Sequence, residues 1–466
     1  MNEPVSLRRV LKFRTIVSTS TGLAYAAISL LSCIQLASSL SGDSGWIAIF
    51  IAGLLAILAA LCFSELNALY PTAAAVRLYM KEAFNDNFSL IMTFGYMLTI
   101  VAIIAADSYI VGSAITYAFH LPNWASLIWI MALLGLSAGA NLRGIKIAGL
   151  LQDITTYSLL AFVIIISLIS LGEHGFQLRS PFAAFGDPVN LINAVAIGVF
   201  IFSGFEWITP LSEEINDIGQ IPRGMFISLG LLGISYALFT VASSHLLNVH
   251  SASVINSPVP QMLLANAALG QVGIWLMLIA TLFTAVMTFN GGFATASRFL
   301  YAAAREDVLP PIFSRISISF AVPYVAVLAL AVASAVIAIL IFLTNQFESV
   351  ILVGAVLEGM IYTIAGLCVI RLRKRRPDAP RAFHIRGGLF FPILTVIIFG
   401  LLAVLASLGI GSNVFPGQPL IITLVILALS ALYVFLYIPR LRTAAAARQA
   451  TRRRRPQREG SGAEAS

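Results

Sequence analysis

Residues 323–343 read PYVAVLALAVASAVIAILIFL, a stretch in which no side chain carries a charge. A helix needs about 20 consecutive apolar residues to cross the hydrocarbon core of a bilayer. Runs of similar length and composition recur from one end of the chain to the other. This pattern predicts a helical protein that crosses a membrane many times.

The overall composition agrees with that prediction. Of the 466 residues, 59% are hydrophobic and 10% are charged, whereas a soluble domain has about 45–50% and about 25%. We expect an all-α integral membrane protein with twelve transmembrane helices and little extramembrane structure. The composition disfavours a secreted enzyme, a disulfide scaffold, a nucleic-acid-binding module and a large ATP-driven engine. The expected spans are 15–40, 45–69, 89–119, 124–141, 147–171, 189–212, 224–247, 271–301, 323–343, 348–370, 389–410 and 419–438.

The 28 basic residues outnumber the 20 acidic ones, and they gather in alternate loops. Basic loops lie on the cytoplasmic side of a membrane, so we expect both termini in the cytoplasm of a cell that carries this protein in its plasma or inner membrane. The chain then divides into a cytoplasmic N-terminal segment (1–14), a twelve-helix domain (15–438) and a disordered basic tail (439–466). At the end of a last span, we expect such a tail to contact anionic membrane lipid or only to fix the topology, rather than to bind nucleic acid. Nothing in the pattern indicates an oligomeric state.

Motifs for cofactor or metal chemistry are absent from the sequence. The three cysteines show no CxxC spacing, and the five histidines show no HExxH pattern. There is no phosphate-binding loop and no catalytic triad in a soluble domain. We therefore expect no cofactor, no metal and no enzymatic activity.

Two runs interrupt the apolar pattern of the spans. Ser18–Gly22 brings four hydroxyls and a glycine into the first span, and Phe202–Glu206 brings a glycine and a carboxylate into the sixth. Backbone unwinds at membrane depth only where it is buried in protein or lines a cavity, and such breaks in corresponding positions of two halves indicate a transport site. The alternative is that small residues only permit close helix packing. The candidate substrate-binding residues beside the two runs are Ser20, Thr21, Gly22, Leu23, Ala24, Phe200, Phe202, Ser203 and Gly204.

Four acidic residues fall inside the expected spans: Asp107, Asp153, Glu206 and Glu358. An acid at the centre of an inserted helix costs about 2.5–3.5 kcal/mol, so each is a candidate for function. Asp153, near the end of its span, is better explained as a hydrogen-bonded polar residue. Asp107 is a candidate ligand for a cationic substrate group. Glu206 and Glu358 are candidates for proton coupling, although Glu358 serves equally well as a helix-packing hydrogen-bond donor.

Four ordered motifs resemble those of the amino acid, polyamine and organocation permeases. They lie after the second span, at the sixth, at the eighth and after the tenth: Glu65 with Tyr70-Pro71; Ser203-Gly-Phe-Glu206 with Leu211-Ser-Glu-Glu214 and Ile221-Pro-Arg223; Asn290-Gly-Gly with Arg298-Phe-Leu-Tyr301; and Arg371-Leu-Arg-Lys-Arg-Arg376-Pro377. The chain departs from the family in its first span, where a glycine-rich break is common and Ser18–Gly22 has a single glycine.

The resemblance implies a five-plus-five inverted repeat with two extra C-terminal helices. Helices one and six would be discontinuous and would hold the substrate between them. By similarity to exchangers within the family, Glu206 takes the position of a proton-sensing glutamate, and Phe200 and Phe202 those of aromatic gates.

The expected function is therefore a permease for an amino acid or a related amine, with proton coupling. An exchanger of the same substrates and a transporter-like nutrient sensor are the alternatives. The sensor would carry a large soluble extension, and an integral-membrane transferase would show acid or histidine clusters near the interface; the sequence has neither.

Overall fold

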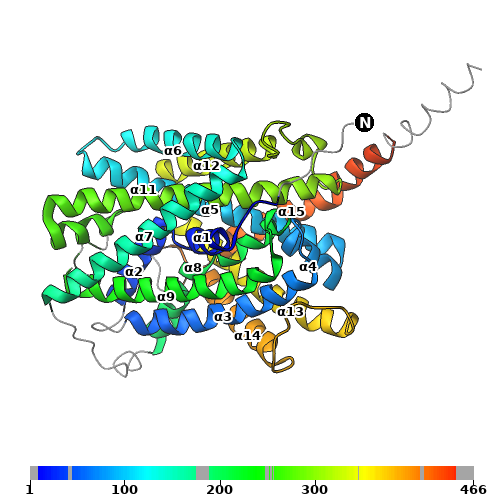
Figure 1. Cartoon of the computed structure of the whole chain (residues 1–466), viewed down its shortest axis with the longest axis horizontal. Helices are drawn as coiled ribbons and strands as arrows, with labels where there is room; N and C mark the ends of the chain where they lie inside the picture. The colour runs from blue at the N-terminus through cyan, green and yellow to red at the C-terminus, as the bar shows by residue number, and fades with distance from the viewer. Residues whose placement is uncertain are drawn as a thin grey trace, which may run out of the picture.

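Helices make up nearly all of the chain that the computed structural model describes, which is residues 9–39, 45–174, 188–246, 251, 254, 257–344, 346–409 and 414–447 (Figure 1). Within these ranges, β-type pairing is limited to a single parallel bridge between Leu11 and Ile215. The all-α expectation is confirmed at this level.

The elements follow one another with short connections. In chain order they are α1 (Phe13–Ala24), α2 (Ala27–Ser39), α3 (Gly45–Leu69), α4 (Ala75–Ala83), α5 (Asp86–Ala118), α6 (Ala125–Leu142), α7 (Ile145–His174), α8 (Pro188–Phe202), η2 (Phe205–Glu214), η3 (Ile218–Gln220), α9 (Ile221–Leu246), α11 (Pro260–Arg305), η4 (Pro311–Ser314), α12 (Tyr324–Thr344), α13 (Phe347–Arg375), α14 (Phe390–Leu408), α15 (Gln418–Leu432) and η5 (Tyr433–Tyr437). Here η2, η3 and η4 are 3₁₀ helices, and η5 is one turn of π-helix within the last long helix.

Eleven helical stretches among the described residues are long and apolar enough to cross a membrane. The chain is therefore a multi-pass membrane protein, as its composition predicts. Gly270, with φ of 56°, bends the long element α11 into a shorter segment and a main span. The main span begins after Gly270, and this agrees with the expected start of the eighth span at residue 271.

The first expected span is 15–40, and its described part, residues 15–39, lies in two elements, α1 and α2, with Tyr25 and Ala26 between them. The hydroxyl-rich run Ser18–Gly22 lies inside α1, several residues before the interruption. Hydroxyl side chains are compatible with a helix because they bond to the preceding turn, and the Thr21 hydroxyl donates to the Val17 carbonyl at 2.8 Å. The helical backbone thus persists through the polar run and ends at Ala24.

The last helical stretch extends to Ala447, beyond the expected boundary at residue 438. The reason is local: residues 444–447 are four consecutive alanines, and alanine has the highest helix propensity. The remainder of the expected disordered tail, residues 448–466, lies outside the described residues.

Burial separates a central layer from a peripheral one. Of the most apolar 18 residues within Ala194–Glu214, a stretch formed by α8 and η2, 89% are buried. In the corresponding stretch of Gln418–Ala447, which includes α15, only 22% are buried. In Figure 1, α1 and α8 lie in the middle of the bundle, with α6 and α12 along one margin and α14 at the other. The two interrupted segments are therefore enclosed by the other helices.

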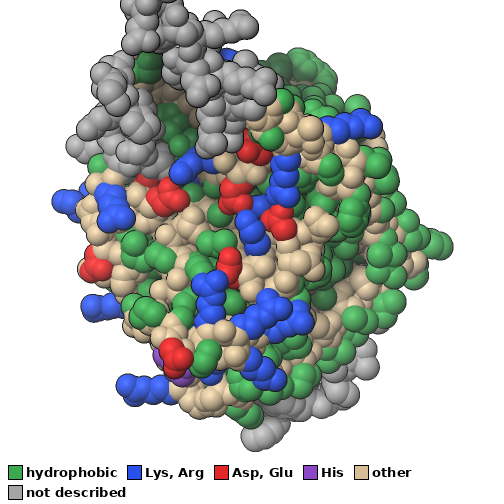
Figure 2. Space-filling model, turned by 90° about the vertical axis from the view of Figure 1, so that its right-hand side faces the viewer, with side chains coloured by type: hydrophobic (Ala, Val, Ile, Leu, Met, Phe, Trp, Pro, Cys, Tyr) green, Lys and Arg blue, Asp and Glu red, His purple; other side chains and the backbone are tan. Residues whose placement is uncertain are grey.

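Charged side chains gather at one end of the bundle, the end that Figure 2 presents to the viewer. Several of them are paired there. Arg77, which is buried, contacts Asp86 and Glu306, and Arg373 donates to Glu65 at 2.5 Å. We call this end the charged end of the bundle.

Candidate functional site

The two interrupted segments touch each other at Gly204. This residue lies between α8 and η2 with φ of 117°, a left-handed conformation that glycine adopts without strain. A Cβ atom built on Gly204 would stand 2.9 Å from the Ala24 amide nitrogen and 3.0 Å from the Leu23 carbonyl carbon. The absence of a side chain at Gly204 thus allows the backbones of α1 and of the α8–η2 junction to come into direct contact.

Tyr236, on α9, holds the ends of both helices. The last carbonyls of a helix have no partner within the helix. The Tyr236 hydroxyl lies 2.7 Å from the Ala24 carbonyl oxygen and 3.2 Å from that of Ile201, and Ser29 also donates to the Ala24 carbonyl, at 2.8 Å. One buried side chain therefore serves a carbonyl from the end of α1 and one from the end of α8.

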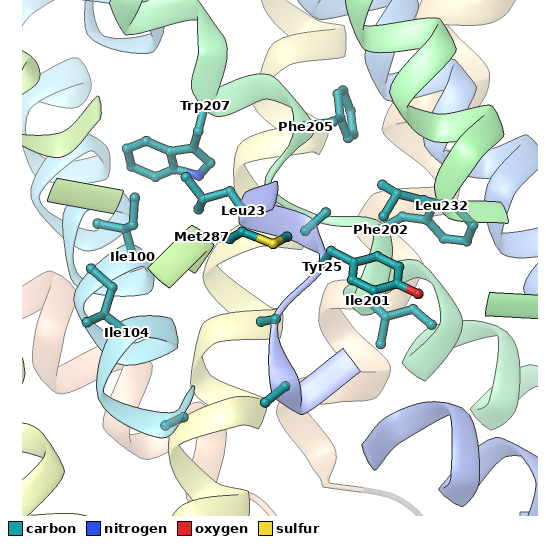
Figure 3. Close-up of a cluster of buried hydrophobic side chains, with 14 of the residues drawn as sticks. Leu23, Tyr25, Ile100, Ile104, Ile201, Phe202, Phe205, Trp207, Leu232 and Met287 are labelled. Carbon is teal, nitrogen blue, oxygen red and sulfur yellow. The ribbon is translucent and has the colours of Figure 1, made fainter. Parts of the chain in front are cut away.

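Apolar side chains surround the interruption between α1 and α2 (Figure 3). Leu23, Met287, Ile100, Ile104 and Trp207 lie toward one side of the picture, and Tyr25, Ile201, Phe202 and Leu232 toward the other; all are buried. The ring of Tyr25 stacks on that of Tyr236, with centroids 5.1 Å apart. The helix ends are thus set in a packed apolar environment in which few polar groups are available.

Glu206, in the first turn of η2, is fully buried and receives three hydrogen bonds. The Tyr96 hydroxyl of α5 donates to Oε1 at 2.8 Å, the Tyr362 hydroxyl of α13 donates to Oε2 at 2.7 Å, and the Gly204 N–H donates to Oε2 at 3.2 Å. These donors come from two neighbouring helices and from the junction itself. The carboxyl group therefore ties η2 to α5 and α13.

Glu358 lies next to this group. It is 2% exposed, and Glu206 and Tyr362 are its interacting neighbours. Glu358 also lines a cavity of about 30 Å³ together with Phe200, Ser203 and Tyr362. The structure thus brings Phe200, Ser203, Gly204, Glu206 and Glu358 into one region, although they come from two separate stretches of sequence.

Phe202 points in a different direction from Phe200. Two residues along a helix correspond to a rotation of about 200°, and the tip of the Phe202 ring lies against Gly53 of α3 and Gly233 of α9. The ring also contacts Tyr236 edge-on at 5.6 Å. Of the two aromatic residues, Phe200 lines the cavity and Phe202 packs between helices.

The hydroxyl-rich part of α1 faces α7 and α9. The Ser228 hydroxyl donates to the Thr21 hydroxyl at 2.9 Å, and a Cβ on Gly22 would collide with the Gln152 side chain. The Ser20 hydroxyl is buried and makes no hydrogen bond with a described residue. These contacts show that Gly22 permits close packing of α1 on α7.

Asp107 is fully buried in α5, but it lies eleven residues from Tyr96. That separation corresponds to about 16 Å along the helix axis, so Asp107 is not part of the group around Glu206. It follows Ile104 by about one turn, and Ile104 packs against Gly292 of α11.

Asp153 accepts hydrogen bonds from Thr15 at 3.1 Å and Ser18 at 2.5 Å, and it pairs with Arg14 at 2.8 Å. Its interpretation as a satisfied polar residue agrees with these contacts.

At the charged end, the segment before α1 and the end of η2 are joined. The Glu214 carbonyl accepts hydrogen bonds from the backbone N–H groups of Val10 (2.9 Å) and Leu11 (3.0 Å). The Glu214 side chain pairs with Arg298 of α11 at 2.9 Å, and both side chains are 1% exposed. The arrangement closes this side of the two interrupted segments.

A larger cavity, of about 600 Å³, lies near the opposite end of α5. Its walls are polar and aromatic, and they include Tyr109, Ser113, Tyr117, His120 and Phe342. The region around Glu206 is therefore tightly packed, whereas the end remote from the charged end is hollowed.

Three tyrosines central to the site, Tyr96, Tyr236 and Tyr362, are missed by the sequence reasoning. Each lies in an apolar run, where a tyrosine usually contributes its ring to packing. The sequence does contain a signal. A buried tyrosine hydroxyl needs a polar partner, and Glu206 has no basic residue at comparable depth in the spans with which to pair.

Comparisons with known proteins bear on the family of this chain. The family described as "Amino acid permease" matches residues 11–436. The chain is 26% identical over 379 residues to the human large neutral amino acids transporter small subunit 2, a match that covers 76% of this chain and 67% of that protein. It is 24% identical to the human Asc-type amino acid transporter 1 (76% and 68% covered) and 25% identical to the branched-chain amino acid permease BcaP of Bacillus subtilis (64% and 61% covered).

Among solved structures, the chain resembles a manganese transporter from Eremococcus coleocola. The TM-score is 0.60, with 95% of this chain and 99% of that one covered, at 14% sequence identity. This likeness concerns the fold alone.

Proposed function

The chain belongs to the amino acid permease family, and from this we propose that it carries an amino acid or a related amine across the cell membrane, coupled to the movement of a proton. The family consists of transporters, and relatives of this chain are named as amino acid transporters. Exchange of one such substrate for another is the alternative mode.

The observation that carries the proposal is the position of Glu206 beside the junction of two interrupted helices. Such junctions expose backbone amides and carbonyls to a ligand. Glu206 is attached to the junction through Gly204 and lies beside Glu358, so this pair of buried carboxyl groups can exchange a proton when the junction moves. Proton binding and substrate binding would then be linked through one local rearrangement.

The substrate site proposed here lies between α1 and the α8–η2 junction. Its backbone and polar contacts come from Ser20, Thr21, Gly22, Ser203 and Gly204. Leu23, Ala24, Phe200 and Phe202 supply the apolar surface, and Phe202 would reach a substrate only after leaving its position against α3 and α9. Asp107, farther along α5, would attract a cationic group of the substrate.

The fold proposed for this function has twelve spans. Here α1 with α2 forms one discontinuous span, and α8 with η2 forms another. Each opens a five-span half of an inverted repeat, with α14 and α15 added at the C-terminal end. The transporter domain then runs over 15–438, between an N-terminal segment at 1–14 and a tail at 439–466. Basic residues at the charged end would contact anionic lipid and place both termini in the cytoplasm.

Counterflow in proteoliposomes tests the substrate class. Vesicles containing the protein are loaded with one unlabelled neutral amino acid, cationic amino acid or polyamine, and uptake of the same labelled compound is followed. We expect trans-stimulated, saturable uptake for at least one amino acid or amine, and none in protein-free vesicles. Absence of stimulation by every compound would count against the proposed function.

A topology reporter fused after Arg442 tests the proposed location of the C-terminal end, and we expect a reporter that works only in the cytoplasm to be active there.

A further inference from the structure

We propose that the proton of this site is bound by Glu358, and that Glu206 acts as the hydrogen-bond acceptor beside it. The proposal rests on the proposed proton-linked transport and deepens it, because it assigns the titrating step to one of two neighbouring carboxyl groups. Two carboxyl groups in contact titrate as a pair, so the assignment requires a structural reason to distinguish them.

The first reason is the number of donors around Glu206. An ionised carboxylate only accepts hydrogen bonds, and Glu206 is offered three: from Tyr96, Tyr362 and the Gly204 amide. The amide can only donate. If the Glu206 carboxyl group gave a hydrogen of its own to one of the two tyrosine oxygens, that tyrosine could no longer donate to Glu206. The surroundings of Glu206 therefore suit it as an acceptor of hydrogen bonds.

The second reason is that Glu358 has fewer donors than Glu206. Neither of its carboxyl oxygens makes a hydrogen bond of good geometry with a described residue, and its interacting neighbours are Glu206 and Tyr362. Its neighbour Tyr362 directs its hydroxyl hydrogen to Glu206 at 2.7 Å. Without a proton, Glu358 would thus be buried beside a second carboxyl group, with its nearest donor already committed to Glu206, and a bound proton removes the cost of burying that charge.

The charged and titratable groups that face Glu358 come from three elements. They are Glu206 from η2, Tyr362 from α13 itself and, through Glu206, Tyr96 from α5. The cavity beside Glu358 is also lined by α8, by the α8–η2 junction and by α14, which contribute Phe200, Ser203, Phe399 and other side chains that do not titrate. Within the described part of the chain, these walls thus provide no cation to neutralise a second carboxylate.

The cavity supplies a place for the proton to leave. Its volume of about 30 Å³ is sufficient for one water molecule, and Ser203 on its wall belongs to the junction between α8 and η2. In the proposed step the O–H bond of Glu358 breaks, the proton passes to a water molecule in this cavity, and the carboxylate remains. No electron is gained or lost. Movement of the junction would connect the cavity to one side of the membrane or the other.

Three variants of the full-length protein in proteoliposomes test the assignment: Glu358→Gln, Glu206→Gln and the control Glu348→Gln, which changes the same residue type in the first turn of the same helix. Uptake is measured with and without an imposed pH gradient, together with counterflow at about pH 5 to 8, where a carboxyl group favoured in its neutral form would titrate. Counterflow reports folding and substrate binding independently of the gradient.

We expect Glu358→Gln to retain counterflow while losing both its dependence on pH and accumulation driven by the gradient. Glu206→Gln should remain pH-dependent, with the midpoint about one pH unit lower, because the charge that favours protonation of Glu358 is gone. Glu348→Gln should match the wild type. A flat profile for Glu206→Gln, or an unchanged one for Glu358→Gln, would overturn the assignment.

An infrared difference spectrum between low and high pH provides a second measurement, which remains decisive if Glu358→Gln does not fold. The band of a protonated carboxyl group should persist in Glu206→Gln, and its disappearance there would overturn the assignment. Failure of the proposed function would look different, since the wild type itself would then show no response of transport to the pH gradient.

Discussion

Gly204 lies so close to α1 that a Cβ atom at this position would stand 2.9 Å from the amide nitrogen of Ala24. The two residues are far apart in the sequence, yet their backbones form the contact between the two interrupted segments. Movement of one segment relative to the other would change this contact, so the proposed link between substrate binding and a conformational change can be tested there.

The substitution Gly204→Ala should therefore impair the protein. The left-handed φ of 117° costs a residue with a side chain about 1–3 kcal/mol, and the added methyl group would also press on Ala24. We expect a lower apparent unfolding temperature in detergent and a loss of counterflow. The control is Gly230→Ala on α9, where a Cβ meets no atom within 4 Å. Equal stability and transport for the two variants would show that the close contact is unimportant.

Removing the hydroxyl of Tyr236 tests how the helix ends are held. In Tyr236→Phe the carbonyls of Ala24 and Ile201 lose a buried donor, at a cost of about 1–3 kcal/mol. We predict a lower unfolding temperature and slower transport, measured by thermal unfolding and by counterflow. Tyr157→Phe is the matched control, because the Tyr157 hydroxyl also donates to a backbone carbonyl, that of Arg14, but at an exposed position. If both variants behaved alike, Tyr236 would contribute only its ring.

The pair of Glu214 and Arg298 should behave as a buried ion pair. Loss of one partner leaves an uncompensated buried charge, which costs about 3–5 kcal/mol. We expect Arg298→Met to be strongly destabilised, and the double variant with Glu214→Gln to recover a large part of the loss. Thermal unfolding of the single and double variants gives the coupling between them. Additive effects would mean that the two side chains do not depend on each other.

Asp107→Asn should weaken transport of cationic substrates more than that of neutral ones. The carboxyl group is fully buried in α5 at membrane depth, where a negative charge is costly and attracts a positive one. Competition between labelled and unlabelled substrates of both classes measures the difference, and the neutral substrates act as the internal control. An equal loss for both classes would assign Asp107 a role in packing.

The sequence predicts the spans well because a membrane imposes a length and an apolar composition on each of them. The run at 323–343, for example, corresponds to α12 almost residue for residue. The point of interruption in the first span is less well predicted. Thr21 can bond to Val17 within a regular helix, so a hydroxyl-rich run does not by itself determine where the helix ends.

The carboxyl groups of the site were identified from their depth, but their neighbours were not. Glu206 and Glu358 are separated by more than 150 residues, and their proximity follows only from the packing of η2 against α13. Tyr96 and Tyr362 are equally invisible as donors, since the sequence of an apolar run does not say which tyrosine hydroxyls point inward. The separation of Phe200 from Phe202 likewise depends on which helices surround α8.

The most direct test of the account is uptake by the wild-type protein in proteoliposomes under an imposed proton gradient, with a substrate identified by counterflow. The external medium is made acidic, and accumulation of the labelled substrate is recorded together with the internal pH from an enclosed indicator. The account predicts accumulation above equilibrium that is accompanied by acidification of the interior and abolished by a protonophore. Substrate movement that is indifferent to the gradient, with no change in internal pH, would contradict it.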